Sequence, residues 1–385
     1  MTDDRRRYGF ATTAIHAGYR PDPVTGAVNA PIYASSTFAQ DGVGGLRSGF
    51  EYARTGNPTR AALETVLAAV EEGRFGRAFS SGMAASDCAL RAVLRPGDHI
   101  VIPDDAYGGT FRLIDKVFRQ WGVHHTPVHL SDLEAVRAAL TDDTRMIWVE
   151  TPTNPLLSVA DIGAIAEIGR DAGAIVLVDN TFASPALQQP LRLGADIVLH
   201  STTKYIGGHS DVVGGALVTD DEELDAAFGF LQNGAGAVPG PFDTYLTMRG
   251  LKTLELRMQR HCDNAVQVAA FLAGHPAVNQ VLYPGLPDHP GHAVAARQMR
   301  AFGGMVSVRL RGGVQAAREL CSRTEIFILA ESLGGVESLI EHPGAMTHAS
   351  TAGSQLEVPD DLVRLSVGIE HPGDLLADLR QALTT

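Results

Sequence analysis

Between about residues 60 and 250, short β-rich runs alternate with stretches of helical periodicity, and this alternation limits the possible folds more than any other feature of the chain. Alternation of this kind predicts βαβ units around a mostly parallel sheet. The runs that predict strands are residues 77–80, 99–103, 146–150, 174–179, 195–199 and 216–218. The stretches that predict the connecting helices are residues 61–72, 84–94 and 162–172.

The pattern changes near both ends of the chain. After residue 251 a long helical segment runs to about residue 274, followed by predicted strands at 305–310 and 363–367 and a terminal helix at 372–383. The first 55 residues are rich in Gly, Pro, Ser and Thr and show little periodicity, and loops of such length tend to be functional. We therefore expect an amino-terminal arm (1–55), a large domain (56–250) and a smaller α/β domain (251–385).

Composition excludes several classes of function. The 44 acidic residues outnumber the 31 Lys and Arg residues, and the resulting net charge of −13 argues against sequence-independent binding to nucleic acid. No signal peptide or uninterrupted apolar run of membrane-spanning length is present, so we expect neither export nor a membrane anchor. Cys88, Cys262 and Cys321 lie far apart, which fits a reducing cytoplasm and suggests neither a disulfide framework nor a metal site.

Lys204 follows a predicted strand and stands among hydroxyl residues, with Ser201 and Thr203 close before it. Open parallel sheets bind ligands at the carboxyl ends of their strands. Partial burial and cationic neighbours lower the pKa of a lysine there and leave a nucleophilic amine near neutral pH, which could form a Schiff base. On this segment alone, a solvated surface lysine is an equal alternative.

Two other segments point to a phosphate and to a cationic ring. The run Ser81-Gly82-Met83 passes from a predicted strand into an alanine-rich helix, and a helix start attracts an anion, although a plain serine cap is the alternative. Asp179 closes an apolar run and needs a cationic partner if it is buried, although it could be a simple turn residue. A protonated pyridine nitrogen is such a partner, so Asp179 and Lys204 together predict pyridoxal phosphate.

The chain resembles a known family over nearly its whole length, from about Thr13 to Leu383. The family is that of the pyridoxal-phosphate enzymes of cysteine and methionine metabolism. The matching segments are residues 52–59, 81–85, 107–110, 150–155, 178–181, 201–205, 332–335 and 364–368. The resemblance implies fold type I of these transferases, which is like that of aspartate aminotransferase. This fold has a large, mostly parallel seven-stranded sheet domain and a smaller carboxyl-terminal α/β domain.

The resemblance also implies roles for individual residues. Lys204 would carry the coenzyme, Asp179 would pair with its pyridine nitrogen, and Tyr107 would stack on its ring and exchange protons. The remaining coenzyme contacts would come from Gly82, Met83, Asn154, Thr181, Ser201 and Thr203. Tyr52 and Arg54 would reach the phosphate of a neighbouring subunit, which implies a homotetramer built as a dimer of dimers with shared active sites.

Substrate contacts would come from Glu51, Arg112, Asn154, Glu331, Ser332 and Arg364, with Arg364 gripping the α-carboxylate through two parallel hydrogen bonds. Gly108 and Gly109 follow Tyr107, where methionine γ-lyases usually carry a cysteine close by, and this argues against methionine as substrate. Glu51, Arg112 and Glu331 resemble residues of the cystathionine γ-synthase and γ-lyase branch, although surface ion pairs are the alternative for each.

The substrates expected from this resemblance are small amino acids. We expect the synthesis of cystathionine from O-succinyl- or O-acetyl-L-homoserine and L-cysteine, a γ-replacement of methionine biosynthesis. The first alternative to this reaction is γ-lyase cleavage of cystathionine to cysteine, 2-oxobutanoate and ammonia. The second alternative is direct sulfhydrylation of the O-acylhomoserine. Synthases and lyases share most of their motifs, so the direction of the reaction stays open.

Other classes of protein fit the sequence less well. A nicotinamide-dependent oxidoreductase needs a G-x-G-x-x-G turn between a strand and a helix, and the glycines between Gly234 and Gly240 have the wrong spacing. A metallo-hydrolase needs clustered ligands, but His124, His125 and His129 have no fitting carboxylate partner. A catalytically silent binding module would be expected to lose the lysine at position 204.

Overall fold

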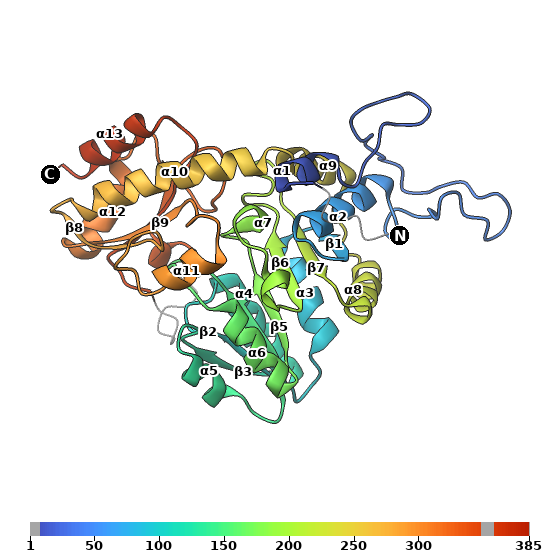
Figure 1. Cartoon of the computed structure of the whole chain (residues 1–385), viewed down its shortest axis with the longest axis horizontal. Coiled ribbons are helices and arrows are strands. Elements are labelled where there is room, and N and C mark those ends of the chain that lie inside the picture. The colour runs from blue at the N-terminus through green and yellow to red at the C-terminus, as the bar shows by residue number, and fades with distance from the viewer. Residues whose placement is uncertain (1–7, 348–357, 385) are drawn as a thin grey trace.

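The computed structural model describes residues 8–347 and 358–384, so the first residues of the predicted arm and part of the predicted carboxyl-terminal domain lie outside it (Figure 1). Its larger sheet has seven strands in the order β1-β7-β6-β5-β4-β2-β3. The strands are β1 Phe75–Phe79, β2 His99–Pro103, β3 His124–Val128, β4 Thr144–Glu150, β5 Ile175–Asp179, β6 Ile197–Ser201 and β7 Gly215–Thr219. Strand β7 pairs antiparallel with β1 and β6, and the other pairings are parallel, which confirms the predicted mostly parallel sheet.

Helices cover both faces of this sheet because its central strands are apolar on both sides. Trp148 and Leu177 pack with α3 and α8 on one face, while Ile147 and Val178 pack with α6 on the other. The helices of this part are α2 Pro58–Val70, α3 Gly82–Val93, α4 Gly108–Arg112, η1 Leu113–Val117, η2 Phe118–Trp121, α5 Leu133–Ala139, α6 Ile162–Ala172, α7 Ser184–Leu187, η3 Pro190–Leu193 and α8 Glu222–Ala235.

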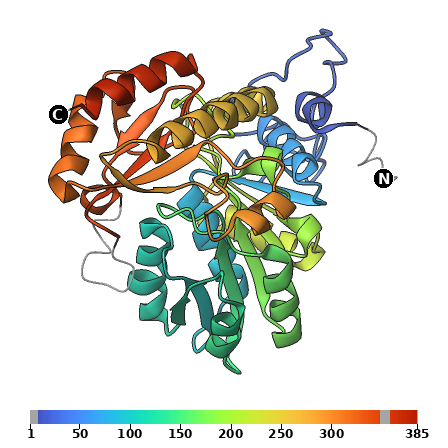
Figure 2. The same cartoon turned by 60° about the vertical axis from the view of Figure 1, so that its left-hand side comes forward.

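The smaller sheet has five strands in the order β10-β11-β12-β9-β8. They are β8 Val278–Leu282, β9 Met305–Leu310, β10 Ile328–Leu329, β11 Leu339–Glu341 and β12 Leu362–Ser366. The helices of this part are α9 Pro241–Leu251, α10 Leu254–Ala273, α11 His292–Gln298, α12 Gly313–Arg323, η4 Pro343–Ala345 and α13 Pro372–Ala382. Helix α10 packs on β8, β9 and α13, and Figure 2 shows it running beside the small sheet. We propose that the domains divide near residues 55 and 250, as the sequence predicts.

The segment before α2 is mostly irregular. Its one helix in the described residues is α1 Phe10–His16, which the sequence pattern does not predict. The following residues form loops that project from the body of the molecule beside α2 and α9 (Figure 1), held by isolated bridges such as Thr37 with Tyr52. Val24, Val28 and Val43 are largely exposed on these loops. An exposed apolar segment of this kind is typical of a surface that contacts another chain.

The predicted strands of the large sheet are all present, each within two residues of its expected ends. Strand β3 is absent from the prediction because its run is polar and contains Pro127. It lies at the edge of the sheet and pairs with β2 alone, so it needs neither two apolar faces nor a complete set of backbone donors. None of the helices in the described part of the chain is long and apolar enough to cross a bilayer.

Candidate functional site

A cavity of about 290 Å³ opens at the carboxyl ends of β4, β5 and β6, between the large sheet and the smaller one. This is the edge at which open parallel sheets bind their ligands. The described residues that line it include twelve of those singled out from the sequence: Gly82, Met83, Tyr107, Asn154, Asp179, Thr181, Ser201, Thr203, Lys204, Glu331, Ser332 and Arg364. Segments separated by more than a hundred residues thus meet in one place.

Lys204 follows β6 and extends its amine into this cavity. Its Nζ donates a hydrogen bond of 2.8 Å to Ser332 Oγ. Burial, aided by the positive charge of Arg364, lowers the pKa of the Lys204 amine to about 8. A substantial fraction of such an amine is uncharged near neutral pH, so it can act as a nucleophile or as a base.

Asp179 ends β5 on the floor of the cavity. Burial raises the pKa of its carboxyl group, and two hydrogen bonds from Thr181 oppose that effect. Thr181 N and Thr181 Oγ1 both donate to Asp179 Oδ1, at 3.0 Å and 2.5 Å. Because both donors use one oxygen, Oδ2 is available to a cationic donor placed in the cavity, and such a partner would offset the cost of burying the charge.

The end of the cavity at the start of α3 can bind an anion. Helix α3 begins at Gly82, and Ser81 Oγ caps it by accepting from Ala84 N at 3.0 Å. The N–H groups at a helix start have no intrahelical acceptor, so those of Gly82 and Met83 can bind an anion. A Cβ atom on Gly82 would lie 2.9 Å from Ser201 Cβ, so only glycine lets the helix start approach Ser201 this closely.

The hydroxyl of Thr203 has partners within the chain as well. It donates to Gly214 O at 3.2 Å and accepts from Gly214 N at 3.0 Å. Through these bonds, the segment before β7 holds the turn that contains Lys204 in place. Thr203 therefore has a structural role in addition to the coenzyme contact that the resemblance implies.

Arg364 lies in β12, where only 2% of its surface is exposed. Its Nη1 donates to Asn154 Oδ1 at 2.7 Å, and its Nη2 donates to Ser332 O at 2.7 Å. Glu341 Oε1 lies 3.1 Å from Nη1 and partly balances the charge. Among the described residues, Arg364 Nε and Glu341 Oε2 have no hydrogen-bond partner. The guanidinium group of Arg364, called the fork below, is held rigidly, and its Nε–H remains available to donate to a carboxylate.

Glu150 is a site residue that sequence reasoning missed. Its two carboxylate oxygens accept from Asn154 N at 3.0 Å and from Tyr107 N at 2.9 Å. Burial, and then the charge of Asp179, raises the pKa of the Glu150 carboxyl well above its usual range. Glu150 thus fixes the positions of Tyr107 and Asn154 in the cavity wall. The available signal was an acidic residue closing the apolar strand β4.

Four predicted site residues do not line the cavity of their own chain: Glu51, Tyr52, Arg54 and Arg112. Arg112 is exposed at the end of α4. Burial raises the pKa of Tyr107 while the charge of Arg112 lowers it, which places Arg112 near that ring. Tyr52 is 46% exposed, and Arg54 Nη1 donates to Asn233 O of its own chain at 2.6 Å.

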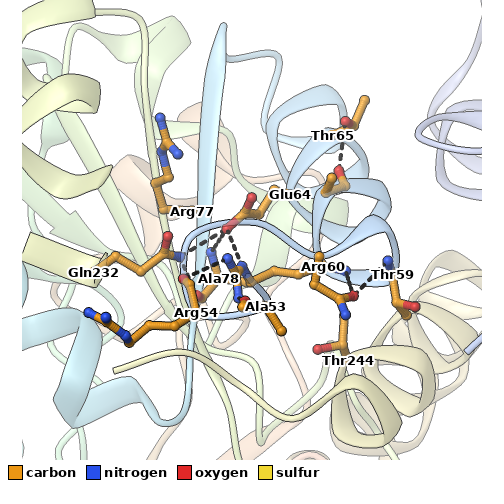
Figure 3. A network of polar contacts seen from close by, with 12 residues as sticks. Ala53, Arg54, Thr59, Arg60, Glu64, Thr65, Arg77, Ala78, Gln232 and Thr244 are labelled. Carbon is orange, nitrogen blue, oxygen red and sulfur yellow. Dashed lines mark hydrogen bonds and ion pairs between the residues drawn. The ribbon is translucent and has the colours of Figure 1, made fainter. Parts of the chain in front are cut away.

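A buried network fixes the segment that carries Tyr52 and Arg54 (Figure 3). Arg60 donates to Ala53 O at 2.8 Å and to Arg54 O at 3.0 Å, and its Nε lies 3.7 Å from Glu64 Oε1. Glu64 in turn accepts from Ala78 N in β1 at 3.0 Å. The backbone of this part of the arm is therefore attached to the large sheet, while its long side chains stay at the surface.

The comparisons with known proteins agree with this site. The family model for the Cys/Met metabolism PLP-dependent enzymes matches residues 11–384. The chain belongs to this family. It is 80% identical over 387 residues to a cystathionine γ-synthase of Mycobacterium tuberculosis, with all of both chains covered.

Two solved structures extend this comparison. The structure of metB from Corynebacterium glutamicum has a TM-score of 0.98 and 62% identity, with 99% of each chain covered. A cystathionine γ-synthase of Xanthomonas oryzae in complex with cystathionine has a TM-score of 0.95 and 48% identity, with 98% of each chain covered. The expected fold type of the PLP-dependent transferases is thereby confirmed.

The cavity fits pyridoxal phosphate, the coenzyme of the family. Lys204 would supply an amine for the aldehyde, Asp179 an open carboxylate oxygen for the ring nitrogen, and the start of α3 its N–H groups for the phosphate. Among the described lining residues, the cationic side chains are Lys204 and Arg364, and both bond to Ser332. Within residues 8–347 and 358–384, the phosphate end therefore contains no cation from its own chain.

Proposed function

We propose that this member of the family makes L-cystathionine from L-cysteine and O-succinyl- or O-acetyl-L-homoserine. Relatives that are 79–80% identical to this chain are named cystathionine γ-synthases, which supports the proposal. The observation that carries it is the pairing, through Ser332, of the Lys204 amine with the buried Arg364 fork. This arrangement suits an α-amino acid, because the fork can hold the carboxylate while the amine stands beside Cα.

Four residues of the cavity have parts in this reaction. Bound pyridoxal phosphate supplies an aldehyde that bonds to amines and a ring that withdraws electrons. Lys204, with its lowered pKa of about 8, takes the Cα proton and returns it. Tyr107, whose pKa burial raises, keeps its hydroxyl proton at neutral pH and can donate it. Asn154 and Arg364 hold the substrate carboxylate.

The outer end of the cavity selects the leaving group and the second substrate. The bond between Cγ and the ester oxygen breaks and the acid leaves as carboxylate, while the cysteine thiol releases its proton and its sulfur forms a bond to Cγ. The cationic Arg112 beside Tyr107 suits the free carboxylate of a succinyl ester. Glu331, exposed at the cavity wall, suits the ammonium group of the incoming cysteine.

The second candidate is the γ-lyase reaction. It is supported by the likeness to a cystathionine γ-lyase of Lactobacillus plantarum, with a TM-score of 0.94 and 47% identity. Direct sulfhydrylation of the same O-acylhomoserine esters is the third candidate reaction. The test incubates the enzyme with each ester, with and without cysteine or sulfide, and separately with cystathionine. Cystathionine formation from ester and cysteine supports the synthase, whereas rapid cleavage of cystathionine without its synthesis would establish the lyase.

We also propose a homotetramer of two dimers in which Tyr52 and Arg54 complete the phosphate site of the neighbouring subunit. The described residues of the same chain place no cation at the phosphate end, which supports this assignment. The assignment is also supported by the large exposed apolar side chains Phe230 on α8 and Leu256 on α10, at 76% and 70% exposure. A cytoplasmic location is supported by Cys88, Cys262 and Cys321, which are unpaired and buried.

A further inference from the structure

Behind the cavity, a chain of buried polar side chains joins the ends of β5 and β6 to α2. Glu71 follows the last residue of α2, His200 lies within β6, and each is only 1% exposed. His200 Nε2 lies 2.5 Å from Glu71 Oε1, and Asn180 Nδ2 donates to the same oxygen at 2.9 Å. Neither the predicted site nor the proposed mechanism uses these side chains.

Two members of this cluster, Asn180 and His200, are each next in sequence to a residue of the coenzyme site. Asn180 follows Asp179, and His200 precedes Ser201. Asp179 and Ser201 line the cavity, whereas successive side chains of a strand alternate between faces, so His200 points to the opposite face. A contact that fixes Asn180 and His200 therefore also fixes the backbone that presents Asp179 and Ser201.

The charge of Glu71 requires a cation beside it. Glu71 lies at the carboxyl end of α2, where the helix dipole disfavours a negative charge. Both of its donors reach Oε1, and Oε2 has no partner among the described residues. A proton on Oε2 would have no acceptor there, and a lone buried carboxylate would be costly. His200 Nε2, 2.5 Å from Glu71 Oε1, is the group placed to supply that cation.

The effect of His200 reaches Asp179. Burial raises the pKa of the Asp179 carboxyl most strongly, and the hydrogen bonds from Thr181 and the charge of His200 lower it. A positive charge at position 200 thus favours the ionised form of Asp179, which is the form that can pair with a protonated ring nitrogen.

The cluster is held from its other side as well. Gln188 Nε2 donates to Asn180 Oδ1 at 3.0 Å, and Gln298 Nε2 in α11 donates to Gln188 Oε1 at 3.1 Å. The Asn180 amide also donates to Gln188 O at 2.9 Å. With its oxygen and its amide both engaged, Asn180 has one orientation only, so Glu71 and His200 meet in a fixed geometry.

We propose that Glu71 and His200 form a buried ion pair that positions the ends of β5 and β6 and keeps Asp179 ionised against the ring nitrogen of the coenzyme. Both are positioning residues, since neither lines the cavity. The inference depends on the binding of pyridoxal phosphate and not on which reaction the enzyme catalyses. The ion-pair proposal therefore stands even if the synthase proposal fails. Likewise, failure of the ion-pair proposal would leave the synthase proposal in place.

The decisive variant is the double substitution Glu71→Gln with His200→Gln. It removes both charges at once, leaves no buried charge alone and so avoids the main cause of misfolding. We expect the dissociation constant of pyridoxal phosphate, titrated into the apoenzyme, to rise by about tenfold or more. We also expect the ring nitrogen of the bound coenzyme to lose its proton about one pH unit lower, as measured by nitrogen NMR with ring-labelled coenzyme.

The matched control is Asp378→Asn, which neutralises another buried carboxylate, in α13 and outside the cavity lining. Asp378 accepts from Glu325 N, Ile326 N and Phe327 N at 2.8–3.0 Å. We expect this control to lower the unfolding temperature without changing either coenzyme measurement. If the double variant behaves like this control, with lower stability but unchanged affinity and unchanged ring protonation, the pair is only a structural contact and the proposal is wrong.

Discussion

Ser332 bonds to Lys204 and Arg364 at the same time, because its hydroxyl accepts from Lys204 Nζ and its carbonyl accepts from Arg364 Nη2. The residue adopts a φ of 92°, which is unusual for a residue other than glycine. The surrounding contacts hold this strained conformation. As a consequence, one residue contacts both the nucleophilic amine and the guanidinium group proposed to bind the substrate carboxylate.

The first prediction concerns the identity of the coenzyme lysine. The chain contains only three lysines, Lys116, Lys204 and Lys252, so the site of attachment can be mapped without ambiguity. Borohydride reduction of the loaded enzyme and peptide mass mapping should place the pyridoxyl label on Lys204. We expect Lys204→Ala to remove the label and to lower kcat by a factor of about 10³ or more, whereas Lys116→Ala should change neither. A label on Lys116 or Lys252 would contradict the assignment.

The second prediction concerns the pH dependence of coenzyme attachment. Because only the free amine attacks an aldehyde and the pKa of Lys204 is lowered to about 8, the rate of attachment to the apoenzyme should rise by about tenfold from pH 7 to pH 9 and then level off. An ordinary lysine would give a rate that still rises above pH 10. The rate is measured by quenching with borohydride at timed intervals.

Ser332→Ala provides the companion measurement. The serine oxygen accepts a hydrogen bond from the amine and so favours its charged form. Its removal should lower the pKa of Lys204 further and move the plateau to lower pH. A plateau that moves to higher pH would mean that Ser332 does not stabilise the ammonium form.

The residues that could be found from sequence are those whose roles follow from local position. Asp179 closes one apolar strand and Lys204 follows the next. Because parallel strands have their carboxyl ends at one edge of the sheet, the proximity of these two residues was predictable. Glu150 also closes a strand, but its role depends on the backbone of Tyr107, which is 43 residues away in sequence. Glu71 and His200 are 129 residues apart, and no local pattern indicates that a helix end and a strand interior meet.

The third prediction concerns the phosphate end. In Gly82→Ala the new Cβ would meet Ser201 Cβ at 2.9 Å and Ser201 Cα at 3.1 Å, so the start of α3 must move away from β6. We expect the dissociation constant of pyridoxal phosphate to rise by about tenfold or more. Gly163→Ala in α6 is the matched control, since its Cβ would make only ordinary contacts at 3.6 Å and beyond. If Gly82→Ala binds pyridoxal phosphate with unchanged affinity, the phosphate does not bind at the start of α3.

The fourth prediction concerns the carboxylate fork. Arg364→Lys keeps the charge beside Glu341 but loses the two parallel donors, so the fold should persist while kcat/KM falls by about tenfold to a hundredfold. Arg309→Lys, in the neighbouring strand β9 and paired with Asp361, is the control and should change kcat/KM by less than about twofold. Equal losses in the two variants would mean that the sheet, and not the fork, is disturbed.

The fifth prediction tests whether two chains build each site. Arg54→Ala removes the arginine proposed to reach the neighbouring phosphate, and Lys204→Ala removes the amine within the chain, so each variant alone should be nearly inactive. In a mixed dimer, one site receives an intact Arg54 and an intact Lys204, while the other site lacks both. Random mixing makes half of the dimers mixed, each with one intact site.

Unfolding the two variants together and refolding them should therefore restore about a quarter of the wild-type activity, measured per subunit. The control mixes Lys204→Ala with Asp179→Ala, two changes at residues that line the same cavity of one chain. In that mixture every site carries at least one defect, so no activity should return. If the Arg54 mixture stays as inactive as this control, Arg54 serves its own chain, and the cation for the phosphate has to come from elsewhere.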